Sequence, residues 1–158
     1  MTKFLIVTLF SLVAAAWGYS AGAPEGVCED MTPKHPVAPQ KSPFPYKVTL
    51  DKSEVQPGEE VLITVSGQPF KGFFVQVRES DKAVGTFQIP GNHKYIKTVN
   101  CFGTKGSAAT HKNAVDKKDV ELVWKAPAKA GKYTVYATVA LDGGTFWVAK
   151  PSGIIKVA

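Results

Sequence analysis

The sequence has few of the residues on which chemistry at protein sites usually depends. Its 158 residues include only two cysteines, and its three histidines, His35, His93 and His111, are scattered along the chain. Zinc sites instead bring together close pairs or triads of His with Cys or carboxylate ligands. There is no Gly-x-Ser-x-Gly motif, and nothing places a Ser or Cys beside a base, as a hydrolytic triad requires. The sequence therefore predicts no enzyme, no cofactor and no metal site.

Arginine is almost absent as well, and this bears on the partners. The formal charge is +6, from 19 Lys and Arg against 13 Asp and Glu, and Arg78 is the only arginine. Nucleic-acid binding and bidentate phosphate recognition usually depend on arginine, so no nucleic-acid partner is expected. A lysine excess suits weak attraction to anionic surfaces, or it serves solubility alone. Arg78 itself is expected to form an ordinary ion pair with a carboxylate.

Long hydrophobic runs occur only at the N-terminus. Residues 4–17 carry no charge, follow Lys3 and precede small residues from Gly18 onward, which is the layout of a secretory signal peptide. The run is shorter than the ~20 residues that a membrane-spanning helix needs. We therefore expect a signal peptide at residues 1–18, cleaved between 18 and 23, and a secreted mature protein without a membrane span. Removing Lys3 lowers the formal charge from +6 to +5.

Secretion changes how the two cysteines are interpreted. In an oxidising compartment, Cys28 and Cys101 are expected to form one disulfide. The bridge would close a loop of about 73 residues, and the chain-entropy account gives it about 4 kcal/mol of stabilisation. Two free thiols or an intermolecular bridge are the alternatives.

The mature chain, residues 19–158, divides into two regions. Residues 19–45 contain six prolines, which excludes a regular helix or a central strand and predicts an irregular Pro-rich arm. Residues 46–158 hold eight or nine short stretches of alternating apolar and polar residues, separated by turn signals and without a helical period. The sequence therefore predicts an all-β fold, with an antiparallel β-sandwich favoured over a barrel.

Two stretches carry much of the predicted core. Residues 120–125 alternate strictly, and Pro127 stops the strand because proline has no N–H to give to a ladder. The inward face of this strand is formed by Val120, Leu122 and Trp124. Residues 70–80 also alternate, with Phe73, Val75 and Val77 on one face and Phe74, Gln76 and Arg78 on the other.

Two features are candidates for ligand binding. Residues 101–118 show no hydrophobic period, and a connection of that length is usually functional or mobile. Its basic residues could form a rim that attracts anions, or a merely solvated loop; they are Lys105, His111, Lys112, Lys117 and Lys118. The second feature is the adjacent pair Phe146 and Trp147, of which one ring must face outward on a strand, where it could stack on a sugar or insert into a lipid. The alternative is that one ring packs in the core and the arm covers the other.

With these segments in view, the chain resembles the reeler (reelin-type) domain family over essentially the whole mature region. Each motif alone is weak, but their order and spacing together are specific. The motifs are Gly22-Ala23-Pro24, Cys28, Met31-x-Pro33-x-His35, Pro57-Gly58, Phe70 to Arg78, Val84-Gly85-Thr86-Phe87, Cys101, Thr110-His111 and Val123-Trp124-Lys125-Ala126-Pro127.

The resemblance implies a sandwich of the immunoglobulin or fibronectin III type with a Cys28–Cys101 bridge, and it supplies no catalytic residues. The similarity is strongest to small secreted insect proteins described as defense proteins. It implies a haemolymph protein of innate immunity that binds lipopolysaccharide or other microbial surface polymers and promotes haemocyte aggregation. The alternative is an extracellular adhesion module that binds host proteins or matrix.

Overall fold

The computed structural model describes residues 19–158, and the predicted signal peptide at residues 1–18 lies outside the described residues. Regular structure in the described part consists of one 3-10 turn and eleven strands, where the sequence predicts eight or nine. They are η1 (Glu25–Val27), β1 (Lys47–Leu50), β2 (Glu54–Val55), β3 (Glu60–Ser66), β4 (Gly72–Glu79), β5 (Lys82–Ala83), β6 (Thr86–Phe87), β7 (Ile96–Cys101), β8 (Thr104–His111), β9 (Val120–Lys125), β10 (Gly131–Ala140) and β11 (Phe146–Val157).

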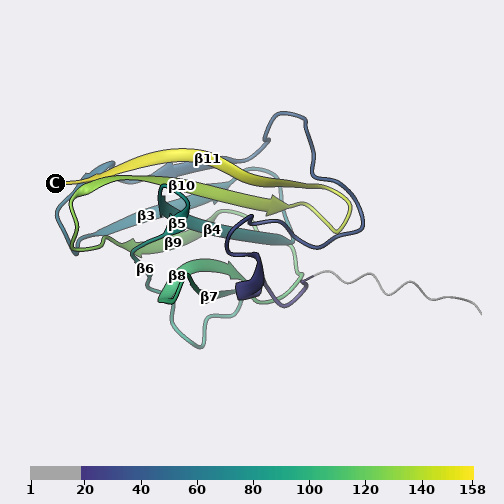
Figure 1. The fold of residues 1–158 in the computed structure, drawn as a ribbon. Helices are drawn as coiled ribbons and strands as arrows, with labels where there is room; N and C mark the ends of the chain where they lie inside the picture. Colours follow the sequence, from purple (N-terminus) through teal and green to yellow (C-terminus); the bar gives the residue numbers. More distant parts are fainter. Residues whose placement is uncertain (1–18) are drawn as a thin grey trace, which may run out of the picture.

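The strands form two sheets, and the prediction of an all-β sandwich is confirmed. One sheet has four strands in the order β1-β3-β9-β6. The other has seven, in the order β2-β11-β10-β4-β8-β7, with the short β5 paired to β4. Neighbouring strands are antiparallel except for β2, which runs parallel to β11. The strands are labelled in Figure 1, where the long β10 and β11 run side by side.

The main core lies between the sheets and follows the predicted alternation. In β9, buried positions alternate with exposed or half-buried ones, and Trp124 is fully buried at 0% exposure. Its indole Nε1 donates a hydrogen bond to the Val84 carbonyl oxygen at 3.0 Å. The prediction that Trp124 belongs to the core is therefore confirmed. Burying an indole with its N–H satisfied contributes both apolar area and a hydrogen bond.

Strand β4 is covered on both faces. Phe73, Val75 and Val77 pack into the main core between the sheets. On the opposite face, Phe74 belongs to a second apolar cluster with residues of the N-terminal segment, which we define as residues 19–45. Figure 1 shows the purple start of this segment beside β7 and β8. The seven-stranded sheet is therefore sandwiched between the main core and the segment.

The expectation of one aperiodic connection from 101 to 118 is wrong, because strand β8 occupies Thr104–His111. β8 pairs with β7 and with β4. Gly106 to Ala109 are buried on this strand, beneath the segment and against the core. Glycine, serine and alanine give no apolar alternation, so the strand is invisible to a hydrophobic pattern. Only residues 112–119 remain as a connection.

Candidate binding site

A cavity of about 370 Å³ lies between the N-terminal segment and one end of the outer face of the seven-stranded sheet. Its walls come from residues 19–36, from the start of β4 and from the ends of β8 and β10. The deep lining is apolar and closely covered, with Val27, Met31 and Phe74 each at most 3% exposed. Lys71 and Asp142 also line the cavity but are exposed, so they mark its opening to solvent.

The polar atoms in the depth of the cavity are already hydrogen-bonded within the protein. Thr138 Oγ1 donates to the Met31 carbonyl oxygen at 2.8 Å and accepts from the Ala149 N–H at 3.0 Å. In residues 19–158, two buried side-chain polar atoms lack a partner, Tyr46 Oη and Asn113 Oδ1, and neither residue lines the cavity. The depth of the cavity is therefore mostly hydrocarbon, and its buried side chains offer no unpartnered hydrogen-bonding atom.

His111, one of the predicted binding residues, closes the end of this cavity. Its Nε2 donates to the Tyr19 carbonyl oxygen at 2.7 Å, and its Nδ1 accepts the Phe73 N–H at 3.2 Å. Burial lowers the pKa of His111, and the nearby charges of Lys117 and Lys97 act in the same direction, whereas the bond to the Tyr19 carbonyl opposes the shift. The imidazole is therefore neutral, and it ties the segment to β4 instead of offering a positive charge to an anion.

The disulfide between Cys28 and Cys101 is formed, so that prediction is confirmed. It joins the end of η1 to the end of β7, with 5.5 Å between the Cα atoms and 73 residues between the cysteines. Both cysteines are buried within the second apolar cluster. The bridge fixes the wall of the cavity to the sheet covalently.

Arg78 does not form the ordinary ion pair that the sequence suggests. It is 8% exposed, and its Nη2 donates to the carbonyl oxygens of Cys28 and Glu29 at 2.7 and 2.9 Å. Its Nε donates to Gln76 Oε1 at 2.7 Å, and Gln76 in turn donates to the Cys28 carbonyl. Burial lowers the pKa of Arg78, but an arginine remains charged. Gln76 and Arg78 therefore clamp the end of η1 onto β4.

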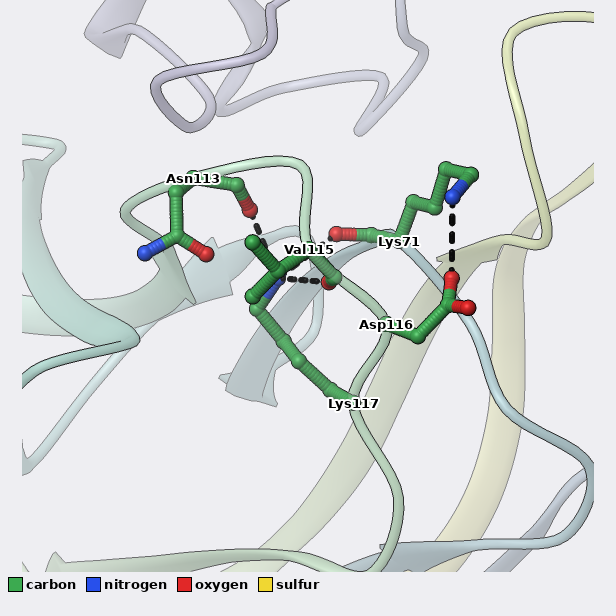
Figure 2. Close-up of polar contacts among 5 residues, drawn as sticks. All are labelled: Lys71, Asn113, Val115, Asp116 and Lys117. Atoms are coloured by element: carbon green, nitrogen blue, oxygen red, sulfur yellow. Dashed lines mark hydrogen bonds and ion pairs between the residues drawn. The ribbon is translucent and has the colours of Figure 1, made fainter.

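Lys117, another predicted binding residue, is buried at 5% exposure and has its donors occupied. Its Nζ donates to the carbonyl oxygens of Lys71, Asn113 and Val115 at 2.9, 2.6 and 2.8 Å (Figure 2). Burial lowers the pKa of Lys117. The neighbouring Lys71 forms an ion pair with Asp116 at 2.9 Å. Lys117 thus organises the 112–119 connection, and the expectation that it faces an external anion is wrong.

A family model described as the Reeler domain matches residues 26–158. The chain belongs to the reeler domain family. It is 40% identical to defense protein Hdd11 of Hyphantria cunea over 162 residues, which cover 98% of this chain and 95% of that protein. It is 36% identical to defense protein 2 of Antheraea mylitta, over 94% of this chain and 96% of that one.

Longer proteins and solved structures also match this reeler domain. Ferric-chelate reductase 1 of Bos taurus is 29% identical over 99% of the chain, but the match spans 26% of that protein. The crystal structure of the human F-spondin reeler domain superposes with a TM-score of 0.61 at 17% identity, covering 77% of this chain and 94% of that one. A second fragment of the same domain gives 0.59 at 19% identity. At these identities the structures support the fold of the reeler domain alone.

The remaining predicted lysines of the reeler domain are exposed but do not lie together. Lys105 is near the start of β8, whereas Lys112 follows its end, so the strand separates them by roughly 20 Å. Lys112 Nζ donates to the carbonyl oxygens of Gly91 and His93. Lys118 lies in the connection before β9. The predicted basic rim is therefore reduced to three dispersed exposed lysines.

Neither Phe146 nor Trp147 is exposed, since their exposed fractions are 0% and 5%, so the hypothesis that one of these rings meets a ligand is wrong. Trp147 packs in the main core, and its Nε1 donates to the Ser42 carbonyl oxygen at 3.2 Å. Phe146 lies against the His35 ring at 5.1 Å between centroids, and its carbonyl accepts the Gln40 N–H. Trp147 is therefore in the core and Phe146 is covered by the N-terminal segment, which is the alternative that the sequence left open.

One exposed aromatic of the reeler domain was not predicted. Phe102 is 39% exposed at the tip of the β7–β8 hairpin. Phe102 and Gly103 both have positive φ, at 54° and 73°, as in a type I′ turn, where Asn-Gly is preferred. A phenylalanine is strained in this conformation. The short Phe-Gly sequence after Cys101 was the available signal, but the missing pattern in β8 concealed the hairpin.

Within residues 19–158, no group of three or more His, Cys, Asp or Glu side chains could hold a metal ion. The same part of the chain has no helix with the length and apolar character needed to cross a bilayer.

Proposed function

We propose that this reeler domain is a secreted, non-catalytic protein of antibacterial defense that binds anionic microbial glycolipids such as lipopolysaccharide and promotes haemocyte aggregation. The observation that carries the proposal is the match over nearly the whole length of proteins named for defense, at 40% and 36% identity. The buried disulfide supports an extracellular location, since disulfides persist in oxidising compartments.

The surface charge supports an anionic ligand. Lys105, Lys112 and Lys118 are exposed, and none of them belongs to the three ion pairs found in residues 19–158. Their ammonium groups therefore have no carboxylate within ion-pair distance. Exposed charges of this kind attract polyanions over a Debye length of ~8 Å at physiological salt, so binding should weaken as salt rises.

Charge reversal tests the proposal. In the variant Lys105→Glu, Lys112→Glu and Lys118→Glu, binding of the secreted protein to lipopolysaccharide should fall at least tenfold at low salt. Reversing three other exposed lysines, one in the N-terminal segment, one in β1 and one just after β1, changes the net charge equally and serves as the control: Lys41→Glu, Lys47→Glu and Lys52→Glu. Equal losses in both variants would mean that net charge alone attracts the ligand. Binding to host extracellular matrix, with none to lipopolysaccharide or whole bacteria, would favour the adhesion role instead.

A further inference from the structure

We propose that the cavity between the N-terminal segment and the outer face of the seven-stranded sheet binds a single linear hydrocarbon chain of an amphiphile, and that it recognises the chain and not the head group. This inference is independent of the lysine surface described above. A free fatty acid and an acyl chain of a microbial glycolipid present the same hydrocarbon to the cavity.

The chemistry of the lining selects hydrocarbon. The deep walls include Val27, Met31 and Phe74, all nearly inaccessible to solvent. The polar side chains among them, Thr138 and His111, use their hydrogen-bonding atoms on the protein backbone. A water molecule needs two to four polar partners to be held, so a lining with few free polar atoms holds water weakly. An apolar ligand satisfies such a cavity without displacing any bound group.

The dimensions suit one chain. The volume of about 370 Å³ falls in the range of roughly 300–1,000 Å³ that small-molecule pockets occupy. The lining includes Lys71 and the first three residues of β4, Gly72 to Phe74, and these four residues span about 10 Å at the rise of an extended strand. The cavity therefore has room for a short chain.

The opening does not select a charged head. Lys71 at the opening is paired with Asp116 at 2.9 Å, and Asp142 there accepts the Gly144 N–H at 2.8 Å. The Nζ of Lys117, which bonds to the Lys71 carbonyl, donates to three carbonyl oxygens in all. Cations and carboxylates thus balance one another around the opening, and the head group of the ligand remains in water.

The site is formed before any ligand arrives. The segment that roofs it is held by the Cys28–Cys101 disulfide and by the bond from Thr138 to the Met31 carbonyl. Beside Tyr19, the Ala23 N–H donates to Thr110 Oγ1 at 3.0 Å. Binding therefore requires no ordering of the roof, which would otherwise reduce affinity.

Calorimetric titration of the secreted protein with octanoate, decanoate, dodecanoate and hexadecanoate tests the proposal directly. We expect saturable one-to-one binding, with affinity rising about fourfold per methylene until the cavity is full. Decanol and a decanoyl lysophospholipid should bind within a few-fold of decanoate, and raised salt should change little. Absence of saturable binding, or equal affinities along the series, would overturn the proposal without help from any variant.

A substitution that fills the cavity with a larger side chain provides the second test. Ala140 lies on the outer face of β10 two residues after Thr138 and lines the cavity. Ala140→Leu should weaken decanoate binding at least tenfold while the melting temperature stays at or above that of the parent. Ala128→Leu makes the same change at an exposed position before β10, roughly 30 Å away along that strand, and should bind as the parent does. Equal binding by the two variants would place the chain elsewhere. Lipopolysaccharide with and without its acyl chains then shows whether a glycolipid uses the cavity.

Discussion

Replacing Lys117 by methionine should lower the free energy of unfolding by about 2–4 kcal/mol. The Nζ atom donates to the carbonyl oxygens of Lys71, Asn113 and Val115 at 2.9, 2.6 and 2.8 Å (Figure 2). Hydrogen bonds to a charged group contribute about 1.5–3 kcal/mol each. The full sum is not expected, because desolvating the ammonium has a cost, which also lowers the pKa of Lys117. In addition, Lys71 and Val115 are exposed, so their carbonyls can turn to water.

Lys118 is the matched control. It is the next residue along the chain, it is exposed, and Lys118→Met removes the same charge. That variant should stay within about 0.5 kcal/mol of the parent, as surface substitutions usually do. Urea unfolding followed by the fluorescence of the buried Trp124 and Trp147 measures both. If the two variants unfold at the same urea concentration, the three carbonyl contacts do not stabilise the fold and the account of the 112–119 connection is refuted.

Four further outcomes follow from the described contacts. Cys101→Ser should cost about 2–5 kcal/mol, measured by urea unfolding, and two alkylatable thiols in the folded parent would contradict the bridge. Trp124→Ala should cost about 3–5 kcal/mol, and an unchanged melting temperature would contradict its burial. Phe102→Asn should stabilise the hairpin by about 0.5–1 kcal/mol because asparagine accepts positive φ before Gly103; a lower melting temperature would show that the ring packs usefully. Burial holds the pKa of His111 below 6.5, so as pH falls past that value the unfolded chain binds the proton first and stability declines. That slope should be reduced in His111→Gln, and equal pH profiles would contradict it.

Local patterns predicted the elements whose side chains alternate in size and polarity. β9 is the clearest case, because Val120, Leu122 and Trp124 differ strongly from the residues between them. The disulfide could be predicted equally well, since a secreted chain with two cysteines allows only one intramolecular pairing. Strand β8 could not be predicted from the sequence pattern. Its buried run from Gly106 to Ala109 consists of small residues, which show no alternation of apolar and polar side chains. These residues are buried because the N-terminal segment and the main core cover them, and those contacts between distant residues are not visible in a local sequence pattern.

The candidate site illustrates the same limit at a larger scale. Lys105 and Lys112 are close in the sequence, yet the unrecognised strand places them at opposite ends of β8. Lys117 looks like any other lysine in composition, but the carbonyls around it come partly from residue 71, distant in the chain. The cavity draws its walls from residues as far apart in the chain as Tyr19 and Gly143. None of these relations is encoded within a window of neighbouring residues.

The face of β4 under the N-terminal segment explains why a fully buried strand contains Gln76 and Arg78. A strand between two apolar layers reads as a nearly continuous hydrophobic run, and Phe73 to Val75 fit that description. The polar pair departs from it because the end of η1 presents the carbonyls of Cys28 and Glu29 to the sheet, and buried carbonyls need donors.

The N-terminal segment is thus held to the sheet, near the end of η1, by the disulfide and by the hydrogen bonds of Gln76 and Arg78. It leaves a mostly apolar cavity at the other end, lined by Phe74 and Ala140 among others. A ligand there would contact the second cluster and leave the Trp124 core undisturbed on the far side of the same sheet.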